Sequence, residues 1–141
     1  MHKQIGLNDE IPMVEPVKPT MYVSILSEVV DYNHKLLNVP CMWKSTKGKG
    51  VKIVILDTGL PNHLDLEPAG GVNFTDSPGL EDVQMHSTHV GGIVAAKAFN
   101  GMGVRGIAPE AEVYYGKVLG DNGNGSVSAI VKGIYWAVDI I

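Results

Sequence analysis

The chain has 141 residues, of which 45% are hydrophobic and 18% are charged. This is the composition of a folded protein with its own core, and it excludes a disordered chain. The net charge of -4 indicates neither nucleic acid nor an anionic membrane as a partner. Cys41 is the only cysteine, so no intrachain disulfide can form, and no apolar run is long enough to span a membrane. Because no apolar secretion signal follows Met1, we expect a cytoplasmic setting.

The first segments of the chain are expected to be short or extended. Three prolines lie among mixed charges in residues 1–20, which predicts an extended surface arm. In residues 22–37 apolar side chains recur at near-helical spacing, and a strand over residues 23–26 remains an alternative. Pro40 suits the first turn of a short helix that ends within residues 43–46.

The run from Val51 to Leu56 is apolar apart from one lysine. It is too short for a typical helix and too continuous for a half-exposed strand. It therefore predicts a strand buried on both faces, as in parallel sheets covered by helices. Asp57 follows this strand directly and precedes a Thr-Gly pair. Because open α/β sheets place ligands and chemistry at the carboxyl ends of their strands, Asp57 is the first candidate for a functional residue.

A helix is predicted from residue 86 to residue 97, where apolar side chains recur at helical intervals. Ser87 or Thr88 could cap its first turn. Each interior glycine costs about 1 kcal/mol relative to alanine. Gly91 and Gly92 therefore indicate a helix that packs closely against its neighbour, which we expect to be the sheet.

The remaining elements complete an α/β pattern. Short strands are expected near residues 72–74 and over residues 111–119, and residues 139–141 resemble the approach to another strand. Ser126 caps a helix with one buried apolar stripe, which comprises Val127, Ile130, Val131, Ile134 and Val138. Strands that alternate with helices predict a doubly wound, mostly parallel sheet with helices on both faces.

Several chemical roles are open for the candidate residues. Asp57 could accept backbone hydrogen bonds after its strand, or it could act in catalysis. An Asp-Thr-Gly sequence also occurs in aspartic proteases, but that fold is all-β and the predicted helices argue against it. His86 and His89 could bind a metal ion together with His63 and Asp65. Alternatively, one of the two histidines is an acid/base group at a helix start and the other packs in the core.

Ordered motifs along the chain resemble the subtilisin-type serine proteases. They lie at residues 51–59, 63–66, 86–96, 106–112, 117–120 and 133–138. Several motifs in order are far more specific than any one of them. The resemblance implies an N-terminal extension over residues 1–37 and the N-terminal part of a peptidase domain over residues 38–141. The sequence of residues 71–76 is most similar to the intracellular branch of that family.

The resemblance implies a role for each of two residues. Catalytic residues of this family follow each other in the order Asp, His, Ser. Asp57 would orient the imidazole of His86, and His86 would accept the proton of a serine nucleophile. His89 would then be a packing residue.

A substrate-binding edge is also implied by the resemblance. Backbone groups of Gly123, Asn124 and Gly125 would pair with a polypeptide substrate by strand addition, and Leu119 and Val127 would line side-chain pockets.

The resemblance further implies a calcium site and an inhibitory arm. A structural calcium ion would be bound by Asp65 and by the loop that contains Asn100. The segment around Ile11 and Pro12 is similar to the N-terminal extension that holds intracellular members inactive by lying across the active site.

The sequence also departs from the family pattern. Met85 and Ser87 replace the glycines that flank the catalytic histidine in the family, which could shift the backbone of His86. No serine here has the sequence context of the family's nucleophile, so we expect the chain to be inactive by itself. Two alternative functions remain: a non-catalytic peptide-binding module, and a metal-binding protein that uses His86 and His89. Self-association through an exposed sheet edge is also expected.

Overall fold

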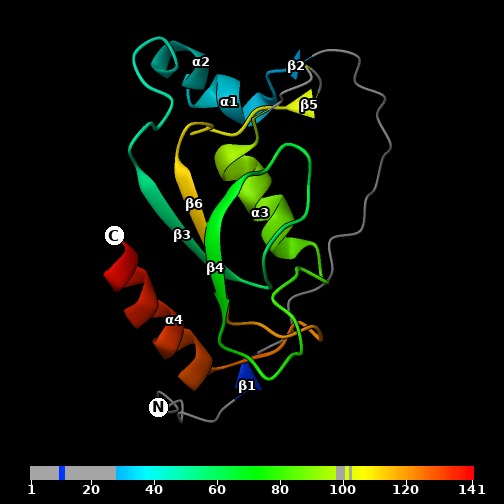
Figure 1. Ribbon diagram of the computed structural model, residues 1–141. Coiled ribbons are helices and arrows are strands. Elements are labelled where there is room, and N and C mark those ends of the chain that lie inside the picture. The colour runs from blue at the N-terminus through cyan, green and yellow to red at the C-terminus, as the bar shows by residue number, and fades with distance from the viewer. Residues whose placement is uncertain (1–9, 12–27, 98–100, 102) are drawn as a thin grey trace, which may run out of the picture.

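The structure is a computed structural model that describes residues 10–11, 28–97, 101 and 103–141. Its centre is a three-stranded parallel sheet (Figure 1). The strand order is β3 (Lys52–Asp57), β6 (Glu112–Lys117) and β4 (Pro68–Asn73). The predicted parallel sheet is therefore confirmed. Its third strand, β4, begins four residues before the strand predicted from the sequence.

One helix covers each face of this sheet (Figure 1). Helix α3 (His86–Ala95) packs on the face to which Ile55 contributes, and α4 (Val127–Ile140) packs on the face to which Leu56 contributes. Neighbouring residues of β3 thus serve two different cores, as expected for a strand with helices on both sides. This arrangement confirms the predicted α/β class with helices on both faces.

Small elements surround the sheet. Helices α1 (Tyr32–Leu36) and α2 (Val39–Met42) precede β3, and Pro40 lies in the first turn of α2 as predicted. Strand β2 (Glu28–Val29) pairs in parallel with β5 (Gly103–Val104). Of the element predicted over residues 22–37, the part before residue 28 lies outside the described residues.

The predicted N-terminal arm is described at one place only. Strand β1 (Glu10–Ile11) pairs in antiparallel fashion with β7 (Gly125–Ser126), which directly precedes α4 (Figure 1). The rest of residues 1–20 lies outside the described residues. In the described part of the chain, no helix is both long enough and apolar enough to cross a membrane.

Only part of the apolar stripe predicted for α4 faces the sheet: Ile130 packs against the core formed by Val118, Leu119 and Ala129. Ala129 and Gly133 are buried, whereas Ile134 and Val138 of the stripe are 50% and 68% exposed. A Cβ atom at Gly133 would lie 2.7 Å from Cγ1 of Val118. At this point helix and sheet are therefore too close for a larger side chain, so Ala129 and Gly133 lie at the closest approach. The prediction of one buried stripe is wrong for Ile134 and Val138, because the periodicity did not show which face of α4 approaches the sheet.

Two local predictions are also corrected. Residues 139–141 do not begin a strand, because α4 continues to Ile140 and the N–H of Ile141 donates to the carbonyl of Ala137. In α3, a Cβ at Gly91 would overlap the hydroxyl oxygen of Tyr115, whereas a Cβ at Gly92 would meet nothing within 4 Å. Close packing against the sheet is therefore confirmed for Gly91 and wrong for Gly92.

Candidate active site

Asp57 and His86 are hydrogen-bonded to each other at the carboxyl end of β3. The two carboxylate oxygens of Asp57 lie 2.8 and 2.9 Å from Nδ1 of His86. Asp57 is only 8% exposed, while the side chain of His86 is 33% exposed. Because a carboxylate only accepts hydrogen bonds, Nδ1 carries the proton and Nε2 of the neutral ring is left with the free lone pair. The pair therefore presents an oriented base.

The backbone of Asp57 is held by the two residues that follow β6. Its carbonyl oxygen accepts hydrogen bonds from the N–H groups of Val118 at 2.9 Å and Leu119 at 3.1 Å. Its Oδ1 accepts from the N–H of Thr58 at 2.6 Å. These bonds fix both the end of β3 and the direction of the carboxylate.

The backbone after Asp57 requires a glycine. Gly59 has a φ of +142°, and a Cβ there would lie 2.5 Å from the carbonyl oxygen of Leu80. That same oxygen accepts from the N–H of Leu60 at 2.8 Å, and the N–H of Asp82 donates to the carbonyl of Leu60 at 2.9 Å. Residues 80–82 are thereby held alongside the segment that follows Asp57.

The first turn of α3 is capped from outside the helix. Ser87 and Thr88 lie within α3, and its N-cap residue, Met85, makes no side-chain cap hydrogen bond. Oδ2 of Asp82 accepts from the N–H of Thr88 at 2.7 Å and from its hydroxyl at 2.6 Å. The N–H of Ser87 donates to the Thr58 hydroxyl at 3.1 Å, which itself donates to Oδ1 of Asp82 at 2.6 Å. The predicted cap is wrong because distant side chains satisfy the free N–H groups of this turn.

Asp82 is the site residue that sequence reasoning missed. Its carboxylate is buried and joins the residue after Asp57 to a residue two positions after His86. It therefore sets the relative position of acid and base without touching either. No motif or periodicity marks Asp82, because it lies in an irregular segment rich in glycine and proline.

The two departures from the family pattern leave the pair intact. Met85 adopts a φ of 63°, a left-handed conformation in which glycine is favoured. Ser87 is fully buried, and its hydroxyl oxygen has no hydrogen-bond partner among the described residues. Both features cost stability. Neither separates His86 from Asp57.

The residues predicted as metal ligands, His86, His89, His63 and Asp65, do not form a metal-binding group in the described part of the chain. No group of three or more His, Cys, Asp or Glu side chains there could hold a metal ion. His89 is exposed, so its predicted packing role is wrong. It lines a cavity of about 700 Å³ that also includes His63 and Asp65. Asn100 lies outside the described residues, so the calcium site stays a prediction.

Part of the predicted substrate edge is a closed turn. Gly123 is buried with a φ of +78°, and its N–H donates to the carbonyl of Gly120 at 2.8 Å. The N–H of Gly120 donates in turn to the carbonyl of Asn124 at 2.7 Å. Because these backbone groups bond to each other within the turn, they cannot pair with a substrate. The extended edge therefore begins only after Asn124.

The extended part of the edge is β7. Ile11 of β1 lies opposite Gly125, and Glu10 lies opposite Ser126. Of the two predicted pocket residues, Leu119 is buried in the core beneath α4, and Val127 is half-buried at the start of α4. The edge is thus able to pair with an extended segment.

Lys117 joins this edge to the segment around Asp82. It ends β6 and is fully buried, and its Nζ donates to the carbonyl of Glu81 at 2.7 Å and to the carboxylate of Asp121 at 2.6 Å. A buried ammonium is stable only when its donors are satisfied. Lys117 therefore orders the turn that precedes β7.

Comparison with known proteins places these residues in a family. The subtilase family matches residues 48–141. The chain is 41% identical over 145 residues to the major intracellular serine protease of Bacillus subtilis (strain 168), a match that covers 94% of this chain and 44% of that protein. It is 38% identical over 128 residues to an alkaline protease of Alkalihalobacillus alcalophilus, covering 89% of this chain and 33% of that protein. Subtilisin Savinase of Lederbergia lenta is 50% identical over 91 residues, covering 64% of this chain and 34% of that protein.

The chain spans 33–44% of the length of these relatives. The family match nevertheless extends over most of the chain and includes β3, α3 and both members of the hydrogen-bonded pair. The chain belongs to the subtilase family of serine peptidases.

Proposed function

We propose that this chain contributes the acid and the base of a serine endopeptidase that cleaves polypeptides. The observation that carries the proposal is the contact of both Asp57 carboxylate oxygens with Nδ1 of His86, at 2.8 and 2.9 Å. With Nδ1–H donated to Asp57, Nε2 of His86 can accept the proton of an attacking serine hydroxyl. The buried carboxylate then stabilises the imidazolium ion that this transfer creates.

We propose that polypeptide outside residues 1–141 supplies the serine nucleophile. Among the described hydrogen bonds, none joins a serine hydroxyl to His86. Ser87 is fully buried, and the hydroxyl of Ser126 accepts from the N–H of Ala129 as a helix cap. Without a nucleophile, turnover in a site of this kind falls by about 10⁶. Residues 1–141 by themselves are therefore proposed to be inactive.

Casein hydrolysis tests the proposal in two forms of the protein. The 141-residue chain alone should show no hydrolysis above background. A fusion to the segment of the Bacillus subtilis relative that follows the matched region should hydrolyse casein. In this fusion, Asp57→Asn or His86→Ala should lower turnover by about 10⁴ or more. Asp76→Asn, which removes an exposed carboxylate, is the matched control and should keep the activity. A fusion that stays active after His86→Ala would contradict the proposal.

We also propose that the N-terminal arm inhibits the site by competing with substrate. A substrate strand added to β7 would need the same backbone groups that β1 uses when Ile11 pairs with Gly125. In the active fusion, deletion of residues 1–20 should increase the rate on a peptide substrate at subsaturating concentration. Deletion of residues 1–8, which keeps β1, is the matched control and should leave the rate unchanged. Equal rates for both deletions would argue against inhibition by β1.

A further inference from the structure

One buried lysine joins the two loops that meet at the carboxyl end of β6. These are the base loop, residues 74–85, which leads to α3, and the edge turn, residues 120–124, which leads to β7. The side chain of Lys117 has no exposed surface, and its Nζ donates to the carbonyl of Glu81 at 2.7 Å and to the carboxylate of Asp121 at 2.6 Å. Because a buried ammonium is costly without acceptors, the folded chain keeps both acceptors in place.

Asp121 of the edge turn contacts the base loop at two further points. Its N–H donates to the hydroxyl of Ser77 at 2.9 Å, and its carbonyl accepts from the side-chain amide of Gln84. Ser77 and Gln84 both belong to the base loop, and Gln84 lies two positions before His86. The edge turn is therefore fastened to the base loop through the main chain of Asp121 and through the ion pair with Lys117.

The base loop in turn holds the base. Asp82, the neighbour of Glu81, accepts from the N–H and the hydroxyl of Thr88 in the first turn of α3. His86 is the first residue of that helix. The ammonium of Lys117 thus holds the base loop one residue away from the carboxylate that caps α3.

The edge turn sets the position of β7. Leu119 and Gly125 form an antiparallel β-bridge across the turn. A Cβ at Gly125 would lie 2.6 Å from Cδ2 of Leu119 and 2.7 Å from the carbonyl oxygen of Val118. The start of β7 is therefore packed tightly against the residues that follow β6, so β7 follows the edge turn when that turn moves.

We propose that Lys117 is a positioning residue that, through its ion pair with Asp121, sets the place of the substrate edge β7 relative to His86. The inference rests on the proposed function, in which an extended substrate pairs with β7 while His86 acts at the cleaved bond. Both parts belong to one substrate chain, so a shift of β7 by about 1 Å misplaces the cleaved bond. A substrate too short to reach β7 does not depend on this alignment.

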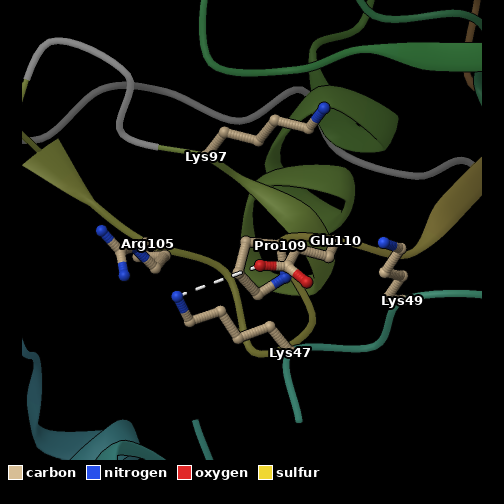
Figure 2. A pocket seen from close by; sticks show the side chains of 6 residues that line it. All are labelled: Lys47, Lys49, Lys97, Arg105, Pro109 and Glu110. Carbon is tan, nitrogen blue, oxygen red and sulfur yellow. Dashed lines mark ion pairs between the residues drawn. The ribbon is translucent and has the colours of Figure 1, made fainter. Parts of the chain in front are cut away.

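Hydrogen exchange in the 141-residue chain tests the link without any activity. Lys117→Met and Asp121→Asn should each accelerate exchange of the Gly120 and Gly123 N–H groups, which are bonded within the edge turn, by about tenfold or more. Lys47→Met is the matched control and should leave both rates unchanged. Its Nζ also faces a carboxylate oxygen, at 3.9 Å, but it lies in the turn before β3 (Figure 2).

The active fusion tests the consequence for catalysis. A tetrapeptide anilide extends about 14 Å from the cleaved bond, whereas an acetylated ester of one amino acid extends about 3.4 Å. Lys117→Met and Asp121→Asn should each raise KM for the tetrapeptide about tenfold and change kcat and KM for the ester less than about twofold. The double variant should raise KM no further, because both changes remove the same ion pair.

Circular dichroism checks that each variant is folded. The side chain of Asp121 is 35% exposed, so Asp121→Asn carries the test even where Lys117→Met does not fold. Unchanged exchange rates in Asp121→Asn would overturn the proposal. Equal losses on the tetrapeptide and the ester would also overturn it, because a merely structural role affects both substrates. A fusion that hydrolyses neither substrate would instead contradict the proposed function, and the exchange rates would then decide the link between Lys117 and the edge turn.

Discussion

The two helices that cover the sheet begin by different means. Helix α4 is capped by its own sequence, because the Ser126 hydroxyl accepts from the N–H of Ala129 at 3.1 Å. Helix α3 begins after Met85, which has a left-handed backbone and makes no side-chain cap, and its first turn is satisfied by Asp82 instead. Local sequence therefore starts α4, whereas contacts between distant segments start α3.

This difference follows from what each helix positions. His86 is the first residue of α3, so whatever holds the start of α3 also holds the base. A cap from within α3 would stabilise the helix without joining it to β3. Asp82 does both, because it also accepts from the hydroxyl of Thr58, the neighbour of Asp57. Helix α4 carries no member of the pair, and a local cap is sufficient for it.

The largest expected effect comes from Asp82→Ala. The variant leaves the N–H and hydroxyl of Thr88 and the hydroxyl of Thr58 without their acceptor in a buried place. We expect the free energy of unfolding to fall by about 3 kcal/mol or more, measured by urea denaturation. Asp76→Ala removes an exposed carboxylate from the same irregular segment and should change stability by less than about 0.5 kcal/mol. Similar losses in the two variants would show that Asp82 does not hold the start of α3.

The next effect is a dependence on pH that originates beneath α3. Burial raises the pKa of Tyr115 from 10.0 to about 12, and the negative charge of Asp82 acts in the same direction. In the folded chain the phenol keeps its proton at a pH where the unfolded chain has lost it. Its contribution is therefore complete below about pH 10 and is lost as the pH rises towards about 12, at up to about 1.4 kcal/mol per pH unit. Urea unfolding across this range should show the slope, and Tyr115→Phe should flatten it. A slope that persists in this variant would assign the titration to another group.

A pair of glycine substitutions tests how closely α3 approaches the sheet. Gly91→Ala would place a methyl group against the Tyr115 hydroxyl and should destabilise the fold by about 1–3 kcal/mol. Gly92→Ala meets nothing within 4 Å and should stabilise by up to about 1 kcal/mol, because alanine is the better helix former. Thermal unfolding of both variants measures the difference. If both changes stabilise, the contact of Gly91 with Tyr115 is not as close as the structure indicates.

The smallest effects test the two helix starts directly. Ser126→Ala removes the local cap of α4 and should lower stability by about 1 kcal/mol. Met85→Gly relieves a left-handed backbone and should raise stability by about 0.5–1 kcal/mol. Changes of opposite sign in the two Tm values would confirm that α4 has a favourable local start and α3 does not. A loss of stability in Met85→Gly would instead assign a packing role to the methionine side chain.

Sequence reasoning succeeded where neighbouring residues carry the information. The run before Asp57 predicted β3, and the motifs around Asp57 and His86 predicted a pair that the structure joins by hydrogen bonds. Ser126 was identified as a cap because the acceptor and its donor lie three residues apart. Predictions failed where the partner is distant, as for the cap of α3 and for the exposed residues Ile134 and Val138 of α4.

The sequence by itself determined the strands and helices around the site, the parallel α/β class and the two residues of the acid–base pair. These follow from hydrophobic periodicity, turn residues and ordered motifs, all of which act over a few neighbouring positions. Only the tertiary structure decided that Asp82 caps α3, that Gly133 lies at the closest approach of α4 to the sheet while Ile134 and Val138 are exposed, and that β1 pairs with β7. Each of these depends on which segments far apart in the chain come close together in space, and the preferences of neighbouring residues do not determine this.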